Sequence, residues 1–379
     1  MDLAKIERVL IIRLSSIGDV IHALPVSAAL KKAYPHLHLT WIVEEMSAEI
    51  VRLDPLVDRV IVLPRSRWKE GRTTNPQVWK EYLQFLKELR KEKFDLSLDL
   101  QGYAKSGLMA LAAGATKRIG WRKMRDGSGM ISPPVPVRKE SLHRVEWFLD
   151  VVRSLGIEQP IGEANFPLVP SSEAKENVSV LLNEGGVTPG TPYVVVNPAA
   201  GNLVRRWGAE NYSEVVREIA NRLALPCVLI GTARDAELNR EVGRLSKAGF
   251  PQTVSLPLDL AGKTSLGEVV ALLAESCLHI CGDTGSAHIS AALKIPVVAI
   301  YGPTDPTFAG PYGQGKGVLF RAGICGAECN AKRCSLVTQT LEGNEIAPCL
   351  SAITPLEVVE KALLRLGETS EERLQSEKR

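Results

Sequence analysis

The chain has 379 residues, a formal net charge of +3 and 45% apolar residues, which is typical of a globular protein long enough for two domains. No apolar run approaches the roughly 18 residues that a membrane-spanning helix needs, so we expect no membrane span. Seven cysteines, scattered along the sequence, do not form the pattern of a secreted disulfide framework. The N-terminal residues lead directly into a strand pattern, so we expect no signal peptide and a reduced, cytoplasmic protein.

The charge is unevenly distributed along the chain. Residues 1–170 carry 26 Lys and Arg against 20 Asp and Glu, a net +6, and the remainder carries 20 against 23, a net −3. A basic first half suits an anionic partner such as a phosphorylated ligand, a nucleic acid or an acidic membrane surface. A solvated surface can also carry this excess, so charge alone does not choose among these partners.

The first half alternates short apolar runs with amphipathic segments. We predict strands at 8–14, 39–43, 60–63 and 96–100, and helices at 20–33, 78–93, 106–113 and 143–155. Pro25 falls inside the first helix and must stand in an initial turn or kink it. This alternation indicates a parallel sheet with helices on both faces.

The pattern restarts after an extended segment at 166–170, where we place the domain boundary. We predict strands at 193–197, 227–231, 278–281 and 297–301, and helices at 212–223, 235–245, 266–275, 287–293 and 355–366. The expected fold is α/β, with two Rossmann-like domains that face each other across a cleft. The domains are predicted at 1–168 and 169–367, and the charged segment 368–379 is expected to be a disordered tail.

The turn Ser15-Ser16-Ile17-Gly18-Asp19 follows the first strand. A dinucleotide-binding fold would place G-x-G-x-x-G here, but that fingerprint is absent, and so is a Walker A motif. Asp19 could act as a general base in a cleft. It could equally be a carboxylate that only complements a helix dipole, and the turn alone leaves both open.

A second turn, residues 282–286, links a predicted strand to a small-residue helix. Its backbone N–H groups could receive a phosphate or a sugar. The sequence Asp-Thr-Gly-Ser at 283–286 also occurs in aspartic proteases. Those proteins are all-β and need two copies of this motif, whereas this chain has a single copy, which precedes a predicted helix. His288 lies on the first turn of this helix, as a ligand contact or as a capping or core residue.

Two groups of cations could hold phosphates or could simply be solvated. Arg205 and Arg206 follow the first strand of the second half, where a small-residue turn could hold a diphosphate. The other group lies in expected loops of the first half: Arg65, Arg67, Lys69, Arg72, Lys117, Arg118, Arg122, Lys123 and Arg125.

Four C-terminal cysteines could form a closed zinc site, because zinc accepts four thiolates. They are Cys325, Cys329, Cys334 and Cys349. No C-x-x-C pair is present, so we favour free or packed thiols and predict no metal.

Taken together, these segments resemble the bacterial ADP-heptose:lipopolysaccharide heptosyltransferases of glycosyltransferase family 9. The resemblance rests on SSIGDVIHALP at 15–25, DLQGYAKSG at 99–107, the strand, turn and RRW at 194–207, LAGKTSLGEVVALL at 260–273, and GDTGSAHISAAL with YGPTDP at 282–306. It covers nearly the whole chain in order. It implies a GT-B fold with the acceptor on the first domain and the nucleotide sugar on the second.

The resemblance also implies a reaction. Heptose would pass from ADP-heptose to a hydroxyl of the lipopolysaccharide inner core, on Kdo-lipid A or the first heptose, in one inverting displacement with Asp19 as general base. The family needs no metal ion and no cofactor beyond ADP-heptose as co-substrate. The implied acceptor is an anionic lipid-linked saccharide, which suggests peripheral contact with the cytoplasmic face of the inner membrane and no nucleic acid partner.

Site residues carry over position by position. Arg205 matches the family's phosphate-binding lysine and Asp283 the carboxylate that contacts the sugar. The remaining donor contacts implied are Thr284, Gly285, His288, Glu237 and Thr264. The predicted acceptor contacts are Arg13, Ser15, Ser16, Gly18, Arg65, Arg67, Lys69 and Gln101.

Three other functions stay open at this stage. A transferase could use another nucleotide sugar for a cell-surface glycan, and a nucleotide-sugar binding protein could lack catalysis. A Rossmann oxidoreductase is disfavoured by the missing G-x-G-x-x-G.

Overall fold

The computed structural model describes residues 3–71, 75–252, 254, 256–321, 323–325, 334, 336, 338–339 and 345–376. The side chains of 69–71, 338–339, 345 and 369–376 lie outside that description. The chain divides into two compact units, Met1–Val169 and Pro170–Arg379, whereas the sequence analysis places the boundary after residue 168.

The first unit is built on five parallel strands. They are β1 Arg8–Ile12, β2 His38–Glu44, β3 Arg59–Leu63, β4 Leu96–Asp99 and β5 Lys117–Gly120. The helices are η1 Leu3–Lys5, α1 Ile17–Ala23, α2 Pro25–Ala33, η2 Glu45–Ser47, α3 Ala48–Arg52, α4 Arg65–Gly71, α5 Pro76–Lys91, α6 Ala104–Ala112, α7 Ser128–Ile131 and α8 Arg144–Arg153.

The strand order of this sheet is β3-β2-β1-β4-β5, the order of a Rossmann half. Ile12 of β1 pairs with Ile42 on one side and Asp99 on the other. Four of the five residues of β1 are buried, as expected for a central parallel strand covered on both faces. Helix α1 ends at Ala23 and Pro25 is the first residue of α2, so the single helix predicted at 20–33 is two helices that meet at this proline.

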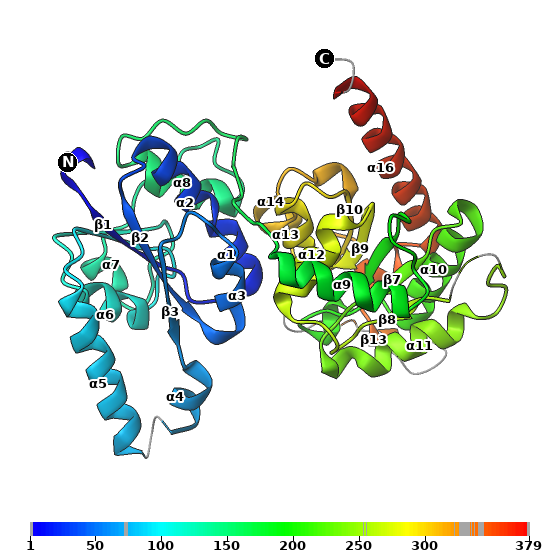
Figure 1. Ribbon diagram of the computed structural model, residues 1–379, viewed down its shortest axis with the longest axis horizontal. Helices are drawn as coiled ribbons and strands as arrows, with labels where there is room; N and C mark the ends of the chain where they lie inside the picture. Colours follow the sequence, from blue (N-terminus) through cyan, green and yellow to red (C-terminus); the bar gives the residue numbers. More distant parts are fainter. Residues whose placement is uncertain are drawn as a thin grey trace. The chain divides into compact units, whose positions relative to one another are not determined.

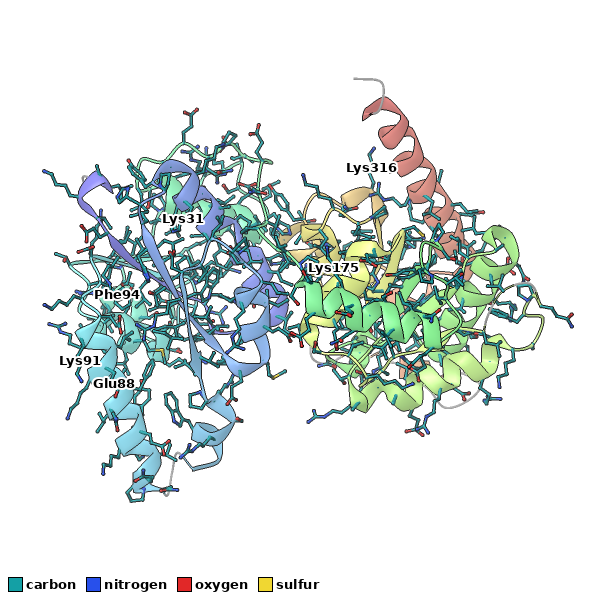
Figure 2. All side chains as sticks on the ribbon, in the orientation of Figure 1. Lys31, Glu88, Lys91, Phe94, Lys175 and Lys316 are labelled. Atoms are coloured by element: carbon teal, nitrogen blue, oxygen red, sulfur yellow. The ribbon has the colours of Figure 1, made fainter. Side chains whose placement is uncertain are left out.

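Helices cover both faces of this sheet (Figure 1). On one face α8 packs against α1 and α2, and on the other α6 packs against α5 and α7. The core between α5, α6 and the sheet includes Leu10, Ile12, Phe94 and Met109. Figure 2 labels Phe94, which is buried, and Glu88 and Lys91 on α5, which are exposed. The apolar face of α5 therefore holds this helix on the sheet.

The second unit is built on six parallel strands and a short antiparallel pair. The strands are β6 Val194–Asn197, β7 Cys227–Leu229, β8 Leu258–Asp259, β9 Leu278–Gly282, β10 Val297–Tyr301, β11 Val318–Phe320, β12 Thr338–Gln339 and β13 Glu345–Ile346. The helices are α9 Ser172–Glu184, η3 Leu203–Arg205, α10 Ala209–Leu223, η4 Ala233–Asp235, α11 Ala236–Ser246, α12 Leu266–Glu275, α13 Gly285–Ala292, α14 Pro306–Ala309, η5 Gly315–Gly317, α15 Pro348–Ser351 and α16 Pro355–Ser376.

The six-stranded sheet has the order β11-β10-β9-β6-β7-β8. Renumbered from β6, this is the complete Rossmann order, with the reversal between β6 and β9. Helix α12 packs against α9 and α13, while α10 packs against α11 and α16. Within the described residues, no helix combines the length and the apolar character needed to cross a membrane.

Some elements differ from the prediction. The basic segment Arg65–Gly71 is a helix rather than a loop, and Lys117 and Arg118 lie on β5. Helix α16 continues past 366 to Ser376, so the tail expected from 368 is a helix as far as the structure describes it. The physical reason is that its Glu, Arg, Leu and Gln residues are good helix formers and no proline interrupts them.

Gly102 is a position where the backbone demands glycine. Its φ is +76°, and an added Cβ would lie 2.4 Å from the carbonyl oxygen of Lys123. We expect Gly102→Ala to lower the free energy of unfolding by about 3 kcal/mol, from backbone strain plus the clash. The measurement is urea denaturation.

Gly156→Ala is the matched control, because Gly156 has a φ of +86° and no heavy atom within 4 Å of the added Cβ. It should cost about 1 kcal/mol from strain alone. Equal losses in the two variants would contradict the role of the close approach at Gly102.

Candidate active site

Both units place polar residues at the point where the strand order reverses. In a Rossmann sheet, ligands bind outside the carboxyl ends of the strands at this reversal. In the first unit it lies between β1 and β4, which lead to Ser15 and Gln101. In the second it lies between β6 and β9, which lead to Asn197 and Asp283. The predicted turns therefore stand where the fold makes a site.

Asp19 lies in the first turn of α1 and is held between two arginines. Arg13 Nη2 lies 2.6 Å from Asp19 Oδ2, and Arg144 Nη1 pairs with the other oxygen. Burial alone would raise the pKa of Asp19, but the two guanidinium groups outweigh it and hold this pKa below its ordinary value. Asp19 is therefore a carboxylate at neutral pH, and it makes two ion pairs in addition to standing at the start of a helix.

Arg13 is the buried partner in this arrangement. Its side chain is only 5% exposed, and Nη1 donates a 2.7 Å hydrogen bond to the carbonyl of Leu100. The guanidinium lies over the rings of Phe148 and Trp121, at 5.4 and 5.9 Å from their centroids. Burial lowers the pKa of Arg13, and Asp19 counteracts this. Arg13 thus fixes the position of Asp19.

Gln101 fixes the serine turn from the neighbouring strand. Its Oε1 accepts hydrogen bonds from the backbone N–H of Leu14 and of Ser15. Asp99 shapes the turn that carries Gln101 by accepting from the N–H of Gln101 and Gly102. Burial raises the pKa of Asp99. Gln101 is therefore a positioning residue as well as part of the site surface.

A cationic cavity of about 500 Å³ opens beside these residues. Its lining holds six cationic side chains and one carboxylate, which favours an anionic ligand. The lining residues are Arg13, Ser15, Ser16, Asp19, Arg65, Gln101, Tyr103, Lys105, Trp121, Lys123, Arg125 and Arg144.

Other predicted acceptor residues fall in different places. Gly18 is in the first turn of α1, and Arg65 lines the cavity, where it pairs with the buried Glu44. Arg67 is outside the cavity lining and pairs with Glu81 at 2.5 Å. This ion pair joins α4 to α5, and the acceptor contact of Arg67 stays a prediction. The side chain of Lys69 lies outside the described residues.

The sequence analysis missed Lys105 and Arg144. Lys105 reaches Glu44 across the sheet at 2.7 Å, and Arg144 reaches Asp19 from α8, 125 positions along the chain. Lys105 stands inside the quoted segment 99–107 but received no role, whereas Arg144 belongs to no such segment and reaches Asp19 only through the fold. The sequence analysis left Lys123 and Arg125 as cations that could hold phosphates or be solvated, and the structure brings them to the cavity.

In the second unit, an ion pair joins two loops at the carboxyl ends of β6 and β9. Arg205 Nη1 lies 2.9 Å from Asp283 Oδ2, with Asp283 almost buried. The neighbouring Arg206 turns elsewhere and donates to Asp235 at 3.0 Å. Of these two neighbouring arginines, Arg205 is therefore the one that contacts the turn before α13.

A buried chain of hydrogen bonds supports that turn. His279 Nδ1 lies 3.1 Å from the carbonyl of Val195, and its Nε2 lies 3.0 Å from Ser286 Oγ. Ser286 Oγ also lies 2.7 Å from Thr284 Oγ1 and accepts from Asn197 Nδ2 at 2.9 Å. The chain connects β6, β9 and the start of α13.

The proton positions in this chain follow from its ends. Burial lowers the pKa of His279 to about 4, so the ring is neutral. Because a carbonyl can only accept, Nδ1 carries the proton and Nε2 accepts from the Ser286 hydroxyl. Ser286 has then used its proton, so Thr284 donates to Ser286. The Thr284 hydroxyl is left with acceptor capacity toward any ligand above the turn.

This chain predicts a pH effect on stability. The pKa of His279 falls from 6.5 in the unfolded chain to about 4 in the native state. Between these values only the unfolded chain binds the proton, so acidification lowers the free energy of unfolding by up to about 1.4 kcal/mol per pH unit. His279→Gln should reduce this slope in urea denaturation at pH 4.5–7. An identical slope in both proteins would contradict the assignment.

The remaining predicted donor residues lie along the same edge of the second sheet. Gly285 begins α13, and His288 on that helix is 7% exposed. Glu237 is exposed in the first turn of α11, after β7. Thr264 precedes α12, and its buried hydroxyl has no hydrogen-bond partner among the described residues. The donor contact predicted for Thr264 stays a prediction.

Three of the four C-terminal cysteines lie within the described residues. Cys329 lies outside the described residues, while Cys325, Cys334 and Cys349 form no disulfide within the part of the chain that the structure describes. Among the residues that the structure describes, no group of three or more His, Cys, Asp or Glu side chains is arranged to hold a metal ion. The four-cysteine set as a whole stays a hypothesis.

The fold matches solved heptosyltransferase structures. The Escherichia coli heptosyltransferase WaaC solved with ADP is 26% identical, with a TM-score of 0.71 over 94% of this chain and 99% of that chain. WaaC solved with ADP-2-deoxy-2-fluoro heptose is also 26% identical, with a TM-score of 0.68 over 93% and 98%. The fold and the site residues together define a GT-B glycosyltransferase.

The sequence comparisons narrow this class to one family. A model of glycosyltransferase family 9 (heptosyltransferase) matches residues 82–338. Lipopolysaccharide heptosyltransferase 1 of Escherichia coli (strain K12) is 30% identical over 315 residues, which are 81% of this chain and 91% of that protein. The chain therefore belongs to glycosyltransferase family 9 and is a heptosyltransferase.

Proposed function

We propose that this enzyme transfers heptose from ADP-heptose to a hydroxyl of the lipopolysaccharide inner core, with inversion and with Asp19 as general base. The observation that carries the proposal is the carboxylate of Asp19, held ionised by Arg13 and Arg144 beside a cationic cavity. The names of the relatives, a lipopolysaccharide heptosyltransferase and an enzyme solved with an ADP-heptose analogue, support the substrates.

The proposed step is a single displacement. The acceptor hydroxyl oxygen attacks the anomeric carbon of the heptose as its proton passes to the Asp19 carboxylate. The bond between that carbon and the diphosphate oxygen breaks, and its electron pair leaves with ADP. Because two guanidinium groups keep Asp19 weakly basic, proton transfer accompanies bond formation rather than preceding it.

The second unit supplies the proposed donor site. Arg205 and the free N–H groups at the start of α13 would stabilise the negative charge on departing ADP. No metal ion or cofactor is proposed for this role. The Thr284 hydroxyl has donated its proton to Ser286 and can only accept a further hydrogen bond. It would therefore accept from a hydroxyl of the sugar and would not bind a phosphate oxygen. Asp283 would contact the sugar, and Thr264 would contact the nucleotide.

The cationic cavity suits an anionic acceptor. Lys123 and Arg125 line this cavity, and Asp19 is the one carboxylate among its described lining residues. Phosphate or carboxylate groups on the acceptor would therefore neutralise these two cations. Burial and the neighbouring arginines lower the pKa of Lys123, and a bound anion would reverse that effect. The proposed acceptor is Kdo-lipid A or a core that already carries the first heptose.

We further propose peripheral contact with the cytoplasmic face of the inner membrane. The net +6 of residues 1–170 would attract anionic lipids, and this attraction is screened within a Debye length of about 8 Å at physiological salt. Binding to vesicles with anionic lipid should weaken steeply as salt rises, with neutral vesicles as the control. Salt-independent binding would contradict the electrostatic association.

A donor screen tests the proposed function. The enzyme is incubated with the acceptor and with ADP-heptose, UDP-sugars or GDP-sugars in turn, and nucleotide diphosphate release is measured. Release only from ADP-heptose, dependent on acceptor, is expected. Preference for UDP or GDP donors would favour another nucleotide-sugar transferase, and tight donor binding without any release would favour a binding protein.

A further inference from the structure

A second pocket lies beside the cationic cavity in the first unit and differs from it in character. Its volume is about 340 Å³, and seven of its ten lining residues are apolar or aromatic. Its walls come from α4, α5, α6 and the ends of the first three strands of the chain (Figure 1). None of the residues so far assigned to the reaction needs an apolar pocket.

Aromatic side chains form much of this apolar pocket. Trp68 of α4 packs edge-on against Tyr82 of α5 at 5.3 Å between ring centroids, and Tyr82 contacts Trp79 at 6.4 Å. Trp79 is 48% exposed, which is a large apolar surface to leave to water. The buried indole N–H of Trp68 has no acceptor among the described residues. The pocket therefore offers a large apolar surface.

The apolar pocket adjoins the cationic cavity. Arg65 and Lys105 line both. Both pair with Glu44, which is 5% exposed and lines the apolar pocket between them. Two cations with one carboxylate leave one positive charge at the junction. A ligand that fills both spaces must therefore join an anionic head to an apolar chain.

We propose that the apolar pocket binds an acyl chain of the anionic lipid-linked acceptor while the acceptor's head occupies the cationic cavity. This inference rests on the proposed function for the identity of the acceptor. The enzyme would then recognise part of the lipid as well as the sugar.

Binding of single-chain phosphates tests the pocket without any turnover. Butyl phosphate and octyl phosphate are titrated below micelle concentration, with tryptophan fluorescence as the readout. Each buried methylene is worth up to about fourfold in affinity, so octyl phosphate should bind at least about tenfold more tightly than butyl phosphate. Octyl glucoside, which lacks the anion, should bind more weakly than octyl phosphate.

A matched pair of variants locates the effect. Trp79→Ala removes a wall of the pocket, while Leu83→Ala removes a similarly exposed apolar side chain of α5 that is outside the lining. Trp79→Ala should lower the affinity for octyl phosphate to nearly that for butyl phosphate. Leu83→Ala should keep the difference between the two affinities. Equal binding of the two phosphates by the unmodified enzyme would overturn the proposal, and so would equal binding of octyl glucoside and octyl phosphate.

Turnover separates this inference from the function on which it rests. KM should be lower for an acylated acceptor than for its deacylated form, and Trp79→Ala should remove the difference while leaving the donor KM unchanged. Equal KM values for the two acceptors would overturn the acyl-chain assignment and leave heptose transfer intact. Chain-length-dependent binding with no transfer to any acceptor would instead refute the proposed function.

Discussion

Replacing Asp19 by Asn should lower kcat by two to four orders of magnitude, because the acceptor hydroxyl loses the group that takes its proton. Donor affinity should change little. Acceptor KM should stay the same or fall, because Arg13 and Arg144 would lose their counter-charge and face the anionic acceptor directly. Steady-state kinetics with both substrates varied, together with donor binding by calorimetry, checks this result.

Asp58→Asn is the control for the loss of a paired carboxylate. Asp58 pairs with Lys31 at 2.9 Å outside the cationic cavity, so its amide variant should keep nearly full activity.

The pH profile of kcat provides a second check on Asp19. Since the pKa of Asp19 is below its ordinary value of 3.8, protonation of this carboxylate should reduce activity only below about pH 4. An Asp19→Asn variant with unchanged kcat would remove Asp19 from the mechanism.

Replacing Arg205 by Gln should lower kcat/KM for the donor by about two to three orders of magnitude. Such losses are typical when one group that stabilises developing negative charge is removed. Arg205→Lys should retain most activity because it keeps the charge, although it loses the planar fork of a guanidinium. Initial rates at subsaturating donor are the measurement.

Arg206→Gln provides a matched control, since this neighbouring arginine pairs with Asp235 rather than Asp283. Arg206→Gln should lower kcat/KM for the donor by less than tenfold. Arg205→Gln also leaves the nearly buried Asp283 without its counter-charge, which could itself repel a diphosphate. The double variant Arg205→Gln, Asp283→Asn separates the effects, and recovery of the donor rate in it would assign the loss to Asp283 rather than to Arg205.

Much of the fold could be predicted because the central strands are continuous apolar runs. All four residues of β6 and all five of β10 are buried, and such runs are typical of parallel strands with helices on both faces. Short elements were missed for a physical reason. The strand β8 is only Leu258–Asp259, which is too short for any periodic pattern.

The helix α9 was missed although its signal was present. Ser171 accepts from the N–H of Ala174 as an N-cap, and the buried residues Ala174, Val178 and Leu182 recur every four positions. This is the pattern of an amphipathic helix. The sequence therefore contains enough information to predict this helix.

The site could be predicted only where its residues cluster in the sequence. The turns after β1 and β9 are continuous segments, so Asp19 and Asp283 were identified together with their neighbours. Arg144 and Lys105 act through contacts that depend on the folded sheet. His279 stands in an apolar strand, and nothing in the sequence indicates that its ring links Val195 to Ser286.

The most direct test of the proposed reaction is the product itself. The enzyme is incubated with ADP-heptose and an acylated, Kdo-containing acceptor, and the product is examined by mass spectrometry and NMR. We predict an acceptor heavier by one heptose, with an anomeric configuration opposite to that of the donor, and no such product from Asp19→Asn on the same timescale. A product with the donor's configuration, or heptose transfer undiminished in Asp19→Asn, would contradict the single displacement assisted by Asp19.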